Sequence, residues 1–350
     1  MSILQKKKSL VGTINSPQQG YVFNPKPEEY DFNFFEKLLY ILLLLVYNNK
    51  KFKYIREVFM RGLLTLRDLS SPEIMDIIEL AIRFKKGWTV NFPGKKMVNL
   101  FYENSTRTQY SFQVAMINLG ITPLSVNLAT SSVQKGETLY DTVRTFEALG
   151  VDGVVIRHTK DEYYRELEGI KVPIFNGGDG KSDHPTQTLL DLMTIYEEFG
   201  RFEGLKIALV GDIAHSRVAH GNAEVMRRLG MKVYISGPKE FASDNTAEYI
   251  DLDKAVETCD IINLLRVQFE RHEESMQITK EEYHEKYGMT VERVAKMKHR
   301  GIIMHPAPIN RGIEIASEVA ECDKSRIYKQ MTNGVYVRMA VITLALQGKL

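Results

Sequence analysis

The amino-acid sequence predicts an α/β protein of two domains, each with a mostly parallel sheet flanked by helices, linked by interdomain helices. Its 350 residues are enough for two domains of ordinary size. Hydrophobic residues make up 44% and charged residues 26% of the chain, which is typical of soluble globular proteins. From residue 63 onward, apolar runs of strand length alternate with helical segments, the order that produces parallel sheets.

The first half of this alternation opens with a well-marked helix. Ser70 or Ser71 can cap it, Pro72 suits its first turn and Gly87 can end it. Short apolar runs that suit buried strands follow, separated by helical stretches such as 109–118. These predicted strands cover residues 97–102, 124–128, 151–156 and 172–175.

The second half repeats the pattern, with predicted strands at 205–210, 232–235, 260–265 and 301–304. A helix at 185–199, closed by Gly200, is expected to carry the chain from one domain to the other. A last helix at about 335–347 is expected to cross back. We therefore predict domains at 61–190 and 191–334, with residues 335–350 packing on the first of them.

Residues 1–60 differ from the rest of the chain. Nine Lys/Arg and five Asp/Glu give this stretch a charge of +4. Its apolar run at 38–46 is far shorter than the ~20 residues that a membrane-spanning helix needs. We treat 1–60 as an N-terminal extension of unknown role; a docked helix, a partner-binding segment and a dispensable stretch all remain open.

The overall composition excludes several classes of function. The net charge is 46 − 44 = +2, too small to indicate a nucleic-acid or membrane partner. Cys259 and Cys322 are the only cysteines, and no Cys/His spacing is typical of a zinc site. We expect a cytoplasmic protein without metal or organic cofactor.

A candidate anion site follows the first predicted strand. Ser105, Thr106, Arg107 and Thr108 place hydroxyls, free backbone N–H groups and a guanidinium at a helix N-terminus, where the dipole favours an anion. An ordinary cap with a solvent-facing arginine is the alternative. Lys135, in a polar loop that includes Ser131, can add a mobile positive charge, although a solvated lysine is the usual case.

Further candidate residues lie where other strands end or helices begin. Arg157 lies at the carboxyl end of a predicted strand, the edge where open α/β sheets bind ligands. His184 precedes Pro185 and is expected to point its ring into the cleft from the start of the helix. Its imidazole can donate to a carbonyl oxygen and Gln187 can bind an amide, although a structural cap remains the alternative.

The second half offers two more arginines at strand ends. Arg217 and Arg266 suit two carboxylates, because the guanidinium fork matches a carboxylate. Asp212 and His215 suggest acid–base catalysis, but a structural, paired Asp212 and an exposed His215 are the favoured interpretation. In the turn after residue 304, Pro306, Ala307 and Pro308 keep backbone carbonyls available as acceptors.

Taken together, these segments resemble the aspartate/ornithine carbamoyltransferase family, and within it the catalytic chains that use aspartate. The runs that carry the resemblance are FYENSTRT at 101–108, KGETL at 135–139, HPTQTLL at 184–190, RVQ at 266–268 and HPAPINR at 305–311. The similarity covers residues 63–346. Residues 1–60 have no counterpart in it, and Ala307 stands where leucine is common.

The resemblance implies a role for each candidate residue. Ser105, Thr106, Arg107 and Thr108 would hold the phosphate of carbamoyl phosphate, assisted by Arg157. Thr108, Arg157 and His184 would polarise its carbonyl oxygen, while Gln187 and the backbone of Pro306, Ala307 and Pro308 would bind its amino group. Arg217, Arg266, Gln268 and Lys135 would bind aspartate, with Lys135 and Ser131 supplied by a neighbouring subunit of a homotrimer.

The implied activity is transfer of the carbamoyl group of carbamoyl phosphate to the amino group of L-aspartate, an early step of pyrimidine biosynthesis. A carbamoyltransferase for ornithine or another amine is the nearest alternative. Arg266 and Ala307 favour aspartate, since ornithine enzymes usually carry cysteine in the proline turn. A non-catalytic relative that only binds anions is the second alternative, and the presence of regulatory chains is left open.

Overall fold

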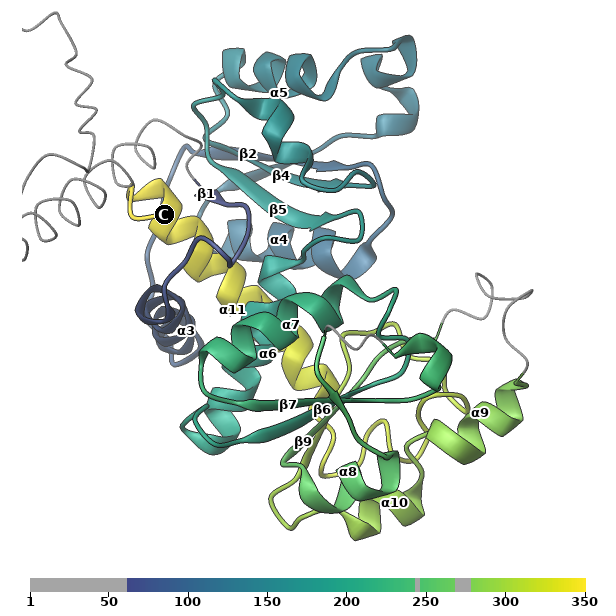
Figure 1. Cartoon of the computed structure of the whole chain (residues 1–350). Coiled ribbons are helices and arrows are strands. Elements are labelled where there is room, and N and C mark those ends of the chain that lie inside the picture. Colours follow the sequence, from purple (N-terminus) through teal and green to yellow (C-terminus); the bar gives the residue numbers. More distant parts are fainter. Residues whose placement is uncertain (1–61, 243–245, 268–277) are drawn as a thin grey trace, which may run out of the picture. The chain divides into compact units, whose positions relative to one another are not determined.

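The computed structural model describes residues 62–242, 246–267 and 278–350 (Figure 1). The predictions for residues 1–60 and for Gln268 lie outside these described residues. The described residues belong to one compact unit. Within this unit the chain forms two five-stranded sheets with helices packed on them.

The first sheet has the strand order β1-β5-β4-β2-β3, and all of its neighbouring strands are parallel. Its central strands are apolar and buried along most of their length, as expected for strands covered on both faces. The strands are β1 (Gly62–Leu63), β2 (Lys96–Phe101), β3 (Thr122–Ser125), β4 (Gly153–His158) and β5 (Ile174–Asp179).

The second sheet is built in the same way, with the parallel order β10-β9-β6-β7-β8. The outermost strand β8 pairs with β7 over two residues. Its strands are β6 (Lys206–Val210), β7 (Lys232–Ser236), β8 (Glu248–Tyr249), β9 (Ile261–Leu264) and β10 (Ile302–Met304).

Two long helices belong to the core that reaches both sheets. Helix α6 (Pro185–Phe199) joins the two halves of the chain, and Gly200 ends it with φ of 70°. Helix α11 (Ile327–Leu346) packs on α6 and on two helices of the first half, α3 (Ser71–Lys85) and α4 (Thr106–Asn118). Buried apolar residues of these helices and of β6 and β7 form one continuous hydrophobic cluster.

The remaining helices are shorter than α3 and α6, and most of them lie around the two sheets (Figure 1). The α-helices are α5 (Leu139–Ala148), α7 (Arg217–Arg228), α8 (Leu252–Thr258), α9 (Lys280–Tyr287) and α10 (Val291–Lys296). The 3₁₀ helices are η2 (Leu128–Thr130), η3 (Ser132–Lys135), η4 (Tyr163–Leu167) and η5 (Lys239–Phe241).

The structure confirms the predicted fold class and corrects several boundaries. The strand predicted at 172–175 is β5, which starts at Ile174 and continues through two glycines to Asp179. Glycine is unfavourable in strands, but the hydrogen-bonded pairing with β4 extends β5 through these glycines. Glycine also leaves room for a neighbouring side chain, since a Cβ on Gly178 would approach Nη1 of Arg157 to 3.1 Å. Likewise the strand predicted at 124–128 is β3, which ends at Ser125.

The last helix begins at Ile327, well before the predicted start at 335. Asn333 and Gly334 are poor helix formers, yet both are buried. Nδ2 of Asn333 donates to Oγ1 of Thr194 at 3.0 Å, and a Cβ on Gly334 would approach Cδ2 of Leu190 to 3.1 Å, so glycine permits close packing there. Among the described residues, no helix is long and apolar enough to cross a membrane. The domain boundaries at 190 and 334 stay predictions.

Candidate active site

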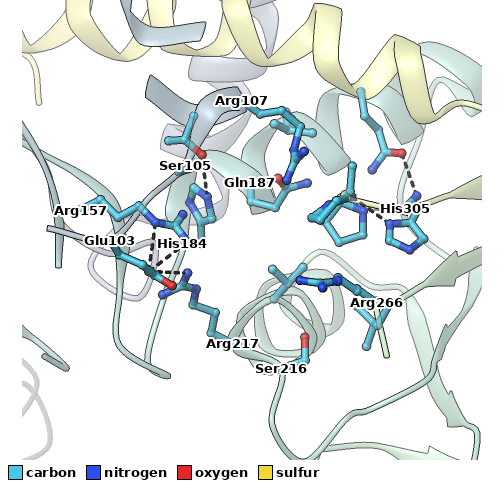
Figure 2. A pocket seen from close by; sticks show the side chains of 18 of the residues that line it. Glu103, Ser105, Arg107, Arg157, His184, Gln187, Ser216, Arg217, Arg266 and His305 are labelled. Atoms are coloured by element: carbon cyan, nitrogen blue, oxygen red, sulfur yellow. Dashed lines mark hydrogen bonds and ion pairs between the residues drawn. The ribbon is translucent and has the colours of Figure 1, made fainter. Parts of the chain in front are cut away.

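The carboxyl ends of strands from both sheets open onto one pocket of about 640 Å³. In parallel α/β sheets this is the edge where ligands bind. Arg157 of β4 and residues that follow β2, β5, β6, β9 and β10 line it, together with residues of α4, α6, α7 and α11. Figure 2 shows side chains from helix starts and from the carboxyl ends of strands turned toward this space.

The N-terminus of α4 forms one wall of the pocket. Ser105 is its N-cap residue but makes no side-chain capping hydrogen bond, and no acidic residue occupies the first turn. Thr106, Arg107 and Thr108 form that turn and line the pocket. The N-terminal N–H groups and the positive end of the helix dipole therefore face the pocket, as an anion site requires.

Arg107 and Arg266 bring two positive charges to the same space. Partial burial, and then the charge of Arg266, lower the pKa of Arg107. Guanidinium groups stay protonated under ordinary conditions. An anion bound between them would relieve this repulsion.

His184 lies at the start of α6, as predicted, and its ring is buried. Its Nε2 lies 3.4 Å from Oγ1 of Thr108. Burial, and then the charges of Arg157, Arg217 and Arg338, hold the pKa of His184 well below its usual value. The imidazole is therefore neutral at physiological pH, so it can donate or accept a hydrogen bond without carrying charge.

Arg157 and Arg217 share an acidic partner that the sequence interpretation missed. Oε2 of Glu103 lies 3.0 Å from Nη2 of Arg157 and 3.1 Å from Nη2 of Arg217. Figure 2 shows this carboxylate between the two guanidinium groups. Burial, followed by the charge of Arg217, lowers the pKa of Arg157 to about 10 despite Glu103. Glu103 thus links a residue of β4 to the first residue of α7.

The proline turn after β10 lies on another wall. Nδ1 of His305 accepts a hydrogen bond of 2.8 Å from the backbone N–H of Ala307, and its Nε2 lies 3.2 Å from Oε1 of Glu314. Burial lowers the pKa of His305, while Glu314 opposes the shift. This ring fixes the turn from inside, and Pro306, Ala307 and Pro308 all line the pocket.

The structure brings most of the predicted site residues together. Gln187 lines the pocket together with Arg217 and Arg266. Asp212 and His215 also line it. Asp212 is buried, His215 is exposed as predicted, and Oδ1 of Asp212 lies 2.8 Å from Nδ1 of His215, a contact that the sequence did not predict.

Two predicted residues lie outside the pocket of this chain. Ser131 donates to the backbone oxygen of Leu128 at 3.1 Å, and Lys135 is exposed at the end of η3. The expectation that both come from a neighbouring subunit stays a prediction, because it concerns a second chain.

Arg338 is a further pocket residue that the sequence did not reveal. It comes from α11, is 3% exposed, and donates to Oγ1 of Thr186 and Oγ of Ser111, each at 3.1 Å. Burial lowers its pKa to about 9. An isolated arginine within a helical segment carries no local signal of a site.

The pocket contains five arginines, and its described lining includes two acidic residues, Glu103 and Asp212. Its chemistry therefore favours anionic ligands. The described residues hold no cluster of three or more His, Cys, Asp or Glu side chains that could bind a metal ion.

Comparison with known proteins agrees with this geometry. Residues 61–197 match the carbamoyl-phosphate-binding domain of aspartate/ornithine carbamoyltransferases, and residues 203–345 match the aspartate/ornithine-binding domain. Similar solved structures include aspartate transcarbamoylase from Trypanosoma cruzi with carbamoyl phosphate and with N-(phosphonacetyl)-L-aspartic acid. Each has a TM-score of 0.74 and 29% identity, covering 82% of this chain and 96% of that one.

The ligand-free Trypanosoma cruzi enzyme is similar at a TM-score of 0.70 and 27% identity, with the same coverage. The two family matches together span most of the chain and meet near the end of α6. This chain belongs to the aspartate/ornithine carbamoyltransferase family.

Proposed function

We propose that this protein transfers the carbamoyl group of carbamoyl phosphate to L-aspartate, giving N-carbamoyl-L-aspartate and phosphate in pyrimidine biosynthesis. The observation that carries the proposal is the placement of the pocket cations. Arg107 and the N-terminus of α4 suit a phosphate, Arg217 and Arg266 suit carboxylates, and neutral His184 lies in the same pocket. The similar Trypanosoma cruzi structures bind carbamoyl phosphate and a phosphonacetyl aspartate.

In the proposed reaction the neutral amine of aspartate attacks the carbonyl carbon of carbamoyl phosphate. A C–N bond forms, and charge develops on the carbonyl oxygen in the tetrahedral intermediate. In this proposal Thr108, Arg157 and His184 donate to that oxygen, and one such donor contributes about 3 kcal/mol to catalysis. Neutral His184 supplies a hydrogen bond without adding to the positive charge.

The intermediate then loses phosphate. The bond between the carbonyl carbon and the phosphate oxygen breaks, and the phosphate leaves with the electron pair. Ser105, Thr106 and Arg107 stabilise the additional charge on the leaving group, and a phosphate oxygen accepts the proton from the amine. Holding two anionic substrates together supplies much of the acceleration.

Aspartate is favoured over ornithine by the charges of the pocket. Bound ornithine carries an ammonium group that needs an acidic or neutral acceptor. Among the described lining residues the acids are Glu103, which lies between two arginines, and Asp212, which pairs with His215. A second carboxylate on the substrate, as in aspartate, matches Arg217 and Arg266 instead. Comparing the products formed with each amine tests this proposal, as set out at the end of the Discussion.

We also propose that the chain works as a homotrimer whose neighbouring subunit supplies Ser131 and Lys135. Helix α4, which begins at the phosphate site, exposes an apolar row at Tyr110, Val114 and Ile117, each more than 40% exposed. Residues spaced in this way lie on one face of a helix. An exposed apolar row on a globular protein is typical of a protein–protein interface.

Subunit mixing tests the shared site. Chains with Arg107→Ala and chains with Lys135→Ala are each expected to be nearly inactive alone. Random reassembly of equal amounts should restore about one quarter of wild-type activity, because three quarters of the trimers are mixed and each has one intact site in three. Activity is measured as carbamoyl aspartate formed after dissociation and reassembly.

The matched control mixes Arg107→Ala with His184→Ala. Both changes fall on the same side of the proposed shared site, so no intact site can form. Recovery in this control, or no recovery in the first mixture, would contradict the shared site.

A further inference from the structure

A buried carboxylate lies directly behind the pocket. Asp191 of α6 is 0% exposed and accepts three side-chain hydrogen bonds. Nε2 of Gln187 reaches its Oδ1 at 2.9 Å, Nε2 of Gln330 reaches the same oxygen at 2.7 Å, and Nδ2 of Asn222 reaches Oδ2 at 2.8 Å. These donors come from α6, α11 and α7, three of the elements that carry pocket residues.

The orientation of the Gln330 amide is set by a backbone group that cannot turn. The N–H of His305 donates to Oε1 of Gln330 at 2.9 Å, so the amide nitrogen of Gln330 must face Asp191. An ionised carboxylate offers acceptors only. Burial raises the pKa of Asp191 to about 6 while its three amide donors oppose the shift, so the carboxylate remains ionised at neutral pH.

The same oxygen sets the orientation of Gln187. Because Oδ1 of Asp191 can only accept, Gln187 must turn its NH₂ group toward it and away from the pocket. Its carbonyl oxygen accepts no hydrogen bond from any described residue, and Gln187 lines the pocket. The free end of this amide is therefore an acceptor at the pocket wall.

The proline turn is held by the same chain of contacts. The N–H that anchors Gln330 belongs to His305, the first residue of that turn. Pro306 and Ala307 follow it along the pocket wall. One carboxylate thus fixes Gln187 and, through Gln330, the turn that carries the other candidate acceptors.

We propose that Asp191 is a positioning residue that makes the site select a transferable group bearing NH₂, by holding the carbonyl oxygen of Gln187 toward the substrate. The inference rests on the proposed function and deepens it. Carbamoyl phosphate donates from its NH₂ group to this acceptor. Acetyl phosphate has the same size and charge but places a methyl group there, which leaves the acceptor without a partner.

The test compares the dissociation constants of carbamoyl phosphate and acetyl phosphate, measured by calorimetry on the purified full-length chain. Wild type is expected to bind carbamoyl phosphate more tightly by at least tenfold, the usual cost of an unpaired buried polar group. In Asp191→Ala, Gln187 can turn either end toward the pocket, and the ratio of the two constants should fall toward one. Asp191→Leu, which keeps more of the side-chain volume, is measured beside it.

Asp191→Asn is the conservative variant and is expected to keep the ratio within about threefold of wild type. The anchored Gln330 still requires an oxygen from residue 191, and that oxygen also serves Gln187. The new NH₂ then faces Asn222, whose Oδ1 has no hydrogen-bond partner among the described residues and can accept once this amide turns. Asn222→Ala is the matched control, because it removes only the contact to Oδ2 and should also keep the ratio.

A purely structural role would weaken both ligands equally and leave the ratio unchanged. An unchanged ratio in Asp191→Ala or Asp191→Leu would overturn the inference, as would a ratio lost in Asp191→Asn. If the other two variants do not fold, a ratio lost in Asp191→Asn still overturns the inference. Wild-type turnover is assayed in parallel: no product from any amine rejects the proposed function, whereas turnover with an unchanged ratio rejects only the role of Asp191.

Discussion

Replacing Arg107 with alanine is expected to lower kcat/KM for carbamoyl phosphate by 10²- to 10³-fold, roughly 3–4 kcal/mol. Arg107 lies in the first turn of α4, where the helix dipole and free N–H groups already favour an anion. In the proposed reaction, this change removes a charge-assisted hydrogen bond in the ground state and in the transition state, where the leaving phosphate gains charge. Initial rates at saturating aspartate, with carbamoyl phosphate varied, measure the effect.

Arg107→Lys is the matched control for this prediction. It keeps one positive charge but loses the planar fork that binds two phosphate oxygens, so an intermediate loss is expected. Carbamoyl phosphate affinity equal to wild type in Arg107→Ala would remove Arg107 from the phosphate site.

Replacing Arg266 with alanine is expected to raise KM for aspartate about 100-fold, the result of losing one charged contact to a carboxylate. Arg266 follows β9 and lines the pocket beside His305 and the proline turn. Carbamoyl phosphate affinity should change much less, because the N-terminus of α4 and Arg107 remain. The measurement is KM for aspartate at saturating carbamoyl phosphate, with carbamoyl phosphate binding determined separately.

Arg201→Ala is the control for charge alone. It removes the same charge from an exposed position outside the pocket lining. A comparable rise of KM in this variant would show that the effect of Arg266 is one of net charge rather than of contact. Equal losses of both substrates in Arg266→Ala would contradict its assignment to the aspartate side.

Local rules predict the elements that carry clear start and end signals. Helix α6 has Pro185 in its first turn and Gly200 beyond its last, and its predicted bounds agree with the structure. Helix α3 agrees for the same reason, since Ser70 and Glu73 form a capping box. The errors fall where tertiary pairing overrides propensity, as at the glycines of β5 and at Gly334 within α11.

In the site, too, residues with a local sequence signal were predicted and residues defined by tertiary contacts were missed. Residues next to strand and helix ends were predicted because that edge of a parallel sheet binds ligands. Glu103 was missed although it lies within the run FYENSTRT, since its partners Arg157 and Arg217 are distant in sequence. Its one usable signal was a carboxylate beside a predicted anion site, which calls for a cationic partner.

Asp191 and Gln330 could not be predicted from local patterns. Each lies within a helix, and the two side chains come into contact only because α6 and α11 pack together. The sequence of a helix does not reveal that one of its acidic residues is buried, because acidic residues are common on solvent-exposed helix faces. Such residues can be identified only from the contacts between helices, which local sequence patterns do not predict.

The most direct measurement of the central proposal is product formation by the purified full-length chain. Carbamoyl phosphate is incubated in turn with L-aspartate and with L-ornithine, and both carbamoylated amines are quantified. The proposal predicts carbamoyl aspartate with release of an equal amount of phosphate, and little carbamoyl ornithine. Preferential formation of carbamoyl ornithine would contradict the assignment of aspartate, and absence of both products from a folded, assembled protein would contradict the enzyme itself.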